Sequence, residues 1–97
     1  MKAVFKYPLE LKPEDQVLSL PWGAEILHVG DQQGILCLWA LVEPPPEAKP
    51  TERCFVVRAT GQAVGRDEVY LGTVGQMNGQ LVWHIFERIS IKTIPVS

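Results

Sequence analysis

The sequence has few of the features that mark secreted, membrane or metal-binding proteins. Its two cysteines, Cys37 and Cys54, are too few for a disulfide framework and lack the CxxC spacing of a metal or redox motif. Its longest uninterrupted apolar run, residues 35–42, is much shorter than the roughly 20 residues that a membrane-spanning helix needs. No apolar segment of signal-peptide length follows Lys2. We therefore expect a cytoplasmic protein with reduced cysteines and no membrane contact.

An excess of positive charge is also missing. The chain has 9 Lys and Arg residues against 11 Asp and Glu residues, which gives a formal net charge of −2. The basic residues are scattered, whereas phosphate binding usually needs a concentrated basic face, so we do not expect a nucleic-acid partner. A content of 46% hydrophobic and 21% charged residues is ordinary for a globular protein, and 97 residues suit one domain.

Residue periodicity predicts strands and gives no convincing helix. Polar and apolar residues alternate, or short apolar runs occur, in segments 3–11, 17–20, 24–29, 35–42, 53–59, 70–77 and 80–87. We predict an all-β fold of about six to eight short strands with little or no helix, as a small antiparallel sandwich or a partly open barrel. Residues 1–88 are expected to form the single β domain, and residues 89–97 a last strand or a tail.

The clearest local signal is the Asn78-Gly79 dipeptide, which favours a type I′ hairpin turn because both central residues need positive φ. In the resulting register Val74 faces Trp83. Glycines inside the first arm, such as Gly72, indicate a bulge or a close backbone approach.

A second hairpin is predicted around the turn at residues 31–34. If Gly30 lies opposite Ile35, then His28 faces Cys37, and both faces of the strand pair are apolar. A strand that is apolar on both sides is usually central in a sheet and covered twice. Because no helix is expected to cover segment 24–42, we predict a homodimer or a higher homo-oligomer.

Residues capable of catalysis or metal binding form no recognisable constellation. As cross-strand neighbours, His28 and Cys37 would resemble a nucleophile–base pair, but no third group that orients them is evident. With His84 and Cys54 they are the soft metal-ligand candidates, and they lack the close spacing of a zinc site. Packing in a half-buried sheet is the favoured interpretation. We expect a protein that is not an enzyme and holds no metal or cofactor.

The loop at residues 60–67 is the best candidate for a small-ligand site. Its Gly-Gln-Ala-Val-Gly-Arg segment at residues 61–66 could hold a phosphate through backbone amides. The loop lacks GxGxxG and GxxxxGK[ST] and precedes no helix, so ordinary loop flexibility is the competing interpretation. The candidate ligand-binding residues are Arg58, Thr60, Gly61, Gly65, Arg66 and His84.

A turn tryptophan and several acidic residues are candidates for contact with a partner protein. Trp22 lies in a Pro-Trp-Gly turn, where we expect it to be exposed, and exposed tryptophans commonly anchor protein interfaces. Residues 43–52 contain four prolines and predict an extended, polyproline-like loop with acidic ends. A second acidic patch lies at residues 67–68. The candidate partner-binding residues are Trp22, Glu43, Glu47, Asp67, Glu68 and Tyr70.

Several sequence blocks together resemble a family of small proteins of unknown function from tailed phages and prophages. The blocks are FKYPLEL at residues 5–11, CLWALVEP at 37–44, RCFVVRATGQAV at 53–64, YLGT at 70–73 and GQLVWHIFE at 79–87. Because these are mostly strand residues, the resemblance implies a shared fold more than a shared site. It carries over no catalytic residue and implies a location in the cytoplasm of a bacterial host.

The resemblance also implies a function class. Small phage accessory proteins often bind and inhibit a host protein, so we expect an inhibitor of a host defence nuclease or effector complex, similar in role to an anti-CRISPR protein. One alternative is a homo-oligomeric protein that binds a small ligand such as a nucleotide. Another is a minor virion or assembly component. The fold by itself does not decide among these functions.

Overall fold

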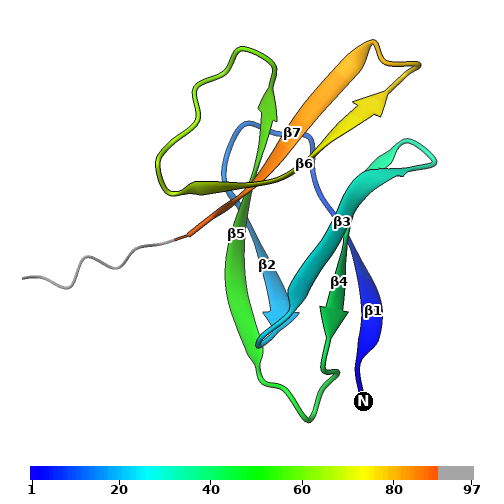
Figure 1. Ribbon diagram of the computed structural model, residues 1–97, viewed down its shortest axis with the longest axis vertical. Helices are drawn as coiled ribbons and strands as arrows, with labels where there is room; N and C mark the ends of the chain where they lie inside the picture. Colours follow the sequence, from blue (N-terminus) through cyan, green and yellow to red (C-terminus); the bar gives the residue numbers. More distant parts are fainter. Residues whose placement is uncertain (90–97) are drawn as a thin grey trace, which may run out of the picture.

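The computed structural model of the protein describes residues 1–89, which form seven β-strands (Figure 1). The strands are β1 (Ala3–Pro8), β2 (Gln16–Pro21), β3 (Glu25–Gln32), β4 (Ile35–Val42), β5 (Pro50–Ala59), β6 (Glu68–Gln76) and β7 (Leu81–Arg88). Residues 1–89 contain no helix, and therefore none that could cross a membrane. The predicted all-β class is confirmed. The predicted last strand or tail lies, apart from Ile89, outside the described residues.

The strands form two antiparallel sheets. The three-stranded sheet has the order β1-β4-β3, and the four-stranded sheet has the order β2-β5-β7-β6. The chain crosses between the sheets after β1, after β2 and after β4, as the colours of Figure 1 show. Of the two strands expected to be central because both of their faces are apolar, β4 is central in its sheet, whereas β3 is an edge strand.

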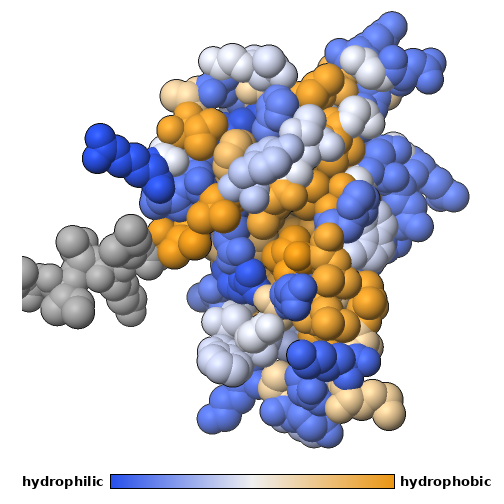
Figure 2. Space-filling view, in the orientation of Figure 1, coloured by the Kyte–Doolittle hydropathy of each residue, from blue (hydrophilic) through white to orange (hydrophobic). Residues whose placement is uncertain are grey.

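The hydrophobic core lies between the inner faces of the two sheets. Hydrophobic residues also gather in the middle of the face that Figure 2 shows, with hydrophilic residues around them. Along β4 the inward side chains Leu36, Leu38, Ala40 and Val42 are each at most 1% exposed. The four-stranded sheet contributes Leu20, Phe55, Val57, Val74 and Ile85. Burial of a large aliphatic side chain stabilises the fold by roughly 1.5–3 kcal/mol before the cost in chain entropy. The core therefore explains why these period-two segments form a sandwich.

The β6–β7 hairpin has the predicted register. Val74 lies opposite Trp83 and Thr73 opposite His84. Asn78 and Gly79 have φ values of 55° and 82°, and the Gln80 amide donates to the Met77 carbonyl oxygen at 3.1 Å, as a tight primed turn requires.

The predicted register of the β3–β4 hairpin is wrong. His28 lies opposite Trp39, and Cys37 lies opposite Gly30. The error has two causes. The turn is only two residues long, because Gln33 and Gly34 both adopt positive φ values of 52° and 85°. A bulge between Ile26 and His28 then shifts the rest of β3 by one residue.

The β3–β4 register removes the nucleophile–base pair that the sequence suggests. The His28 ring packs beside Trp39, with ring centroids 5.6 Å apart, and Gly30 leaves room for it. A Cβ atom on Gly30 would lie 2.9 Å from His28 Nε2. Cys37 is 1% exposed and lies between its strand partners Pro8 of β1 and Gly30 of β3.

Contacts between β3 and β6 join the two sheets. The bulge expected near Gly72 lies between Tyr70 and Gly72, and a Cβ atom at Gly72 would come within 2.5 Å of Val29 Cγ2. The buried Gln76 donates from Nε2 to Asp31 Oδ1 at 2.7 Å and accepts the indole N–H of Trp83 at 2.9 Å. Close packing and a hydrogen bond between β3 and β6 therefore hold the two sheets together on this side.

Candidate partner-binding groove

The six residues predicted to bind a partner fall into two groups. Trp22, Glu43 and Glu47 line one groove, which lies beside the turn that connects β2 to β3 and the loop that connects β4 to β5. Asp67, Glu68 and Tyr70 lie at or beside the start of β6 in the four-stranded sheet. The two groups share no hydrogen bond or ion pair among the described residues, so they are separate candidate sites.

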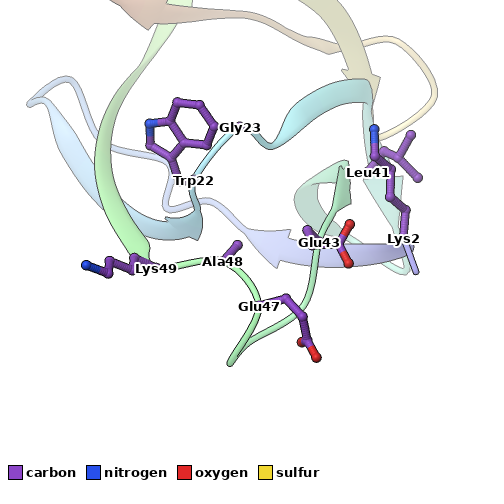
Figure 3. Close-up of a pocket in the computed structure, with 8 residues that line it drawn as sticks. All are labelled: Lys2, Trp22, Gly23, Leu41, Glu43, Glu47, Ala48 and Lys49. Carbon is purple, nitrogen blue, oxygen red and sulfur yellow. The ribbon is translucent and has the colours of Figure 1, made fainter.

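The groove has a volume of about 570 Å³. Its lining residues are Lys2, Trp22, Gly23, Leu41, Glu43, Glu47, Ala48 and Lys49. In Figure 3, Trp22 and Leu41 stand on opposite sides of the opening, Glu43 lies between them, and the Lys49 side chain points away from the rest. The groove therefore combines apolar walls with charged residues of both signs, the glutamates Glu43 and Glu47 and the lysines Lys2 and Lys49.

Two connections between the sheets build this groove. In the turn after β2, Gly23 has a φ of +81°, and the Ala24 amide donates to the Pro21 carbonyl oxygen at 3.1 Å. The Trp22 amide donates to the Lys49 carbonyl oxygen at 2.7 Å, which ties this turn to the loop after β4. The backbone of Trp22 is thus fixed while its side chain remains 73% exposed.

The charges at the groove are only partly neutralised within the chain. The N-terminal ammonium group of Met1 lies 2.8 Å from Glu43 Oε1. The exposed Glu47 has no ion-pair partner within residues 1–89. Its amide donates to the Pro44 carbonyl oxygen at 3.2 Å, which holds the loop in place without involving the carboxylate. The carboxylate of Glu47 is therefore available to a cationic group from outside.

The outer face of the four-stranded sheet is organised differently, because its charged residues bind one another. Arg88 donates from Nε to Asp15 Oδ2 at 2.8 Å and from Nη1 to Asp67 Oδ2 at 2.9 Å. Arg58 donates from Nε and Nη2 to the two oxygens of Glu68, both at 3.2 Å. The Glu68 side chain is only 2% exposed. The predicted acidic patch is therefore an internal ion-pair network.

These contacts keep the network ionised. Burial would raise the pKa of Glu68 above its ordinary 4.5, but hydrogen bonds from Arg58 and the Gly65 amide, with the charges of Arg58 and Arg88, outweigh burial and lower it. The hydrogen bond from Arg88 lowers the pKa of Asp15, and hydrogen bonds to Asp15 and Asp67 raise the pKa of Arg88. At neutral pH the network sets the three carboxylates of Asp15, Asp67 and Glu68 against the two arginines, Arg58 and Arg88.

The predicted phosphate cradle holds a carboxylate of the same chain. The Gly65 amide donates to Glu68 Oε2 at 2.7 Å, and Arg58 pairs with the same side chain. The exposed loop residues Gly61 and Arg66 make no side-chain hydrogen bond or ion pair among the described residues. Two of the groups expected to receive an anion are therefore already engaged.

The remaining candidates form a hydrogen-bonded row. His84 Nε2 lies 2.8 Å from Thr60 Oγ1, His84 Nδ1 lies 3.0 Å from Thr73 Oγ1, and Thr73 Oγ1 contacts the Tyr70 hydroxyl at 2.5 Å. Tyr70 also packs edge-on against Phe86. Within residues 1–89 no cluster of His, Cys, Asp or Glu has the arrangement of a metal site. The row links Thr73 of β6 and His84 of β7 to Thr60, which follows β5.

Several residues of both sites were not predicted from the sequence. In the groove these are Lys2, Leu41, Ala48 and Lys49, and in the network they are Asp15 and Arg88. No local pattern marks Asp15 and Arg88, because each lies far along the chain from its partner. These two residues are 73 positions apart.

Comparison with known proteins gives one match. The family model of DUF7352, a domain of unknown function, matches residues 1–93. No curated protein and no solved structure matches the chain.

Proposed function

Because the chain belongs to the DUF7352 family, whose function is unknown, we propose a function from geometry: a non-catalytic binding module whose partner protein docks in the Trp22 groove. The observation that carries the proposal is the 73% exposure of Trp22 beside a groove of about 570 Å³. A volume of this size accommodates one or two side chains of a partner. Water contact over most of a tryptophan side chain is unfavourable, and a partner that covers it would recover that free energy.

The partner's chemistry follows from the groove lining. Trp22 and Leu41 offer apolar contact, and Glu47 offers an unpaired carboxylate at the rim. Glu43 is already paired with the N-terminal ammonium group at 2.8 Å, so Glu47 is the groove carboxylate left to receive a cation. We expect a partner segment that inserts an apolar side chain beside Trp22 and carries a Lys or Arg residue near Glu47.

Selection of displayed peptides on the full chain tests this proposal. Peptides enriched on the wild-type chain should combine an apolar and a basic residue and should lose at least about 2 kcal/mol of binding free energy, roughly 30-fold in affinity, with Trp22→Ala. Tyr70→Ala is the matched control, because Tyr70 is an aromatic residue that is 57% exposed on the other candidate site. Peptides that bind Trp22→Ala normally but lose affinity for Tyr70→Ala would overturn the proposal.

The narrower form of the proposal makes the partner a host protein, in the bacterial cytoplasm, that binding inhibits. Its support is the resemblance of the strand blocks to small phage and prophage proteins. A defence nuclease or an effector complex would be the expected target. Co-purification of one host protein with the wild-type chain, its loss with Trp22→Ala and inhibition of its activity by the purified chain would support this form. A captured protein whose activity does not change would contradict it.

A further inference from the structure

The two sheets have four edge strands, and three of these carry a device that discourages pairing with another strand. β1 has a lysine, Lys6, and then Pro8, which lacks an N–H. β3 and β6 each contain a bulge and contact one another. Bulges, edge lysines and edge prolines are the common means of blocking an exposed edge. β2 has none of them before its last residue, Pro21.

The backbone groups of β2 that face outward can be identified from the register. The Trp22 amide binds the Lys49 carbonyl oxygen, one step beyond the Pro21–Pro50 pair. Hydrogen-bonded and non-bonded pairs alternate along an antiparallel ladder, so Gln16, Leu18 and Leu20 bond to β5. Val17 and Ser19 therefore direct their N–H and C=O groups away from β5, toward the free edge.

The core is also incomplete beside this edge. Phe5 lies opposite Ala40 on the inner face of β1, yet it is 38% exposed. A hollow of about 270 Å³ separates it from β2, and its lining residues are Phe5, Tyr7, Ser19, Leu20, Pro21, Pro45 and Pro50. β2 is an edge strand of the four-stranded sheet, and it borders the hollow with Ser19, Leu20 and Pro21. A strand added at β2 would cover this apolar surface.

We propose that the added strand is β2 of a second copy of this chain. Residues directly opposite in an antiparallel pair share a face, so a two-fold axis must pass through a residue to keep inward side chains opposite inward ones. An axis at Leu18 places Val17 opposite Ser19 of the second copy. All outward N–H groups of Gln16–Leu20 are then used, in four hydrogen bonds between the copies.

The composition of β2 suits self-pairing. Gln16–Leu20 carries no charge, so two identical strands bring no like charges together, whereas two β1 strands would bring their Lys6 residues close. On the outer face of the sheet, the side chains along the dimer interface would be those of Val17, which is 58% exposed in the single chain, and Ser19. The dimer would join two four-stranded sheets into one continuous sheet.

Two measurements on the full chain test this inference. The first is molar mass by light scattering over a range of concentrations for the wild type, Ser19→Pro and Lys6→Pro. Each variant removes an outward N–H from an edge strand, so the two are matched. We expect a dimer for the wild type and Lys6→Pro and a monomer for Ser19→Pro. A monomeric wild type at the highest soluble concentration, or loss of the dimer with Lys6→Pro alone, would overturn the proposal.

The second measurement needs no variant and stands even if Ser19→Pro fails to fold. Amide hydrogen exchange of Val17 and Ser19 should slow by at least about tenfold as the protein concentration rises, because their N–H groups gain partners only in the dimer. The outward amides of Val4 and Lys6 on β1 should exchange at a rate independent of concentration. Fast exchange at Val17 and Ser19 in a chain of dimeric mass would place the interface elsewhere.

Discussion

The Trp22 groove and the outer face of the four-stranded sheet contain similar residue types but use them differently. Both have acidic side chains and an exposed aromatic residue. On the outer face Asp15, Asp67 and Glu68 are each paired with an arginine, and Glu68 is almost completely buried beneath Arg58 and Arg88. At the groove Glu47 is exposed without an ion-pair partner among the described residues, and Trp22 is 73% exposed.

This comparison separates residues that stabilise the fold from residues that are available for binding. A carboxylate already held by an arginine at 3.2 Å gains little from an outside cation, because the existing pair must first be broken. An exposed carboxylate without an ion-pair partner can bind an outside cation without first breaking an existing pair. Charge and aromaticity in the sequence therefore indicate a binding site only where the fold leaves them unsatisfied.

The largest expected difference lies between two tryptophans. Trp83 packs against the core and donates its indole N–H to Gln76, so Trp83→Ala should lower the free energy of unfolding by roughly 3 kcal/mol. Trp22→Ala should change it by less than about 0.5 kcal/mol, because its side chain supports nothing inside the fold. Urea denaturation of both variants measures this difference. Equal destabilisation by the two substitutions would show that Trp22 stabilises the fold and is not a residue left available for binding.

The next expected effect concerns the ion-pair network. Arg58→Ala leaves the Glu68 carboxylate buried with the Gly65 amide and a more distant Arg88, and should destabilise the fold by roughly 2–3 kcal/mol. Arg66→Ala, in the adjacent loop, removes an exposed arginine and should cost less than about 0.5 kcal/mol. Denaturant midpoints at neutral pH decide the result. An unchanged denaturant midpoint for Arg58→Ala would mean that the ion-pair network is not required for stability.

A smaller effect should appear with pH. The pKa of Glu68 is lowered in the folded state from an ordinary value of 4.5, so its contribution to stability is complete above pH 4.5 and is lost as pH falls through the folded value. The wild type should therefore lose stability in acid below pH 4.5, and Glu68→Gln should lose less over the same range. Denaturation curves across this range measure the loss. Glu47→Gln should behave as the wild type does, and an acid loss identical in all three chains would contradict this assignment.

The fold could be predicted largely from local signals. Period-two alternation and short apolar runs located every strand of residues 1–89, and the positive φ required at Asn78 and Gly79 fixed the β6–β7 register. The β3–β4 register could not be predicted, since Gln33, a residue that seldom adopts positive φ, occupies the turn and a bulge adds one residue at Leu27.

The sites were harder to predict because they depend on contacts between distant residues. The exposure of Trp22 follows from its turn, but its groove requires the bond to Lys49 and the position of Leu41. Asp67 and Glu68 look like free acidic residues in the sequence. Only the arrival of Arg88 from β7 and Arg58 from β5 shows that they are paired. The edge of β2 likewise becomes visible only when the sheet order is known.

Amide chemical-shift mapping of the full chain with a peptide selected on the wild type tests most directly whether a partner binds in the Trp22 groove. If a partner binds in the groove, the shifts should concentrate at the Trp22 indole, Leu41 and residues 43–49. Residues 65–70 and His84 should remain unchanged. Shifts centred on Tyr70 and Asp67, with the Trp22 indole unmoved, would contradict binding in the groove and would make the outer face of the four-stranded sheet the binding site.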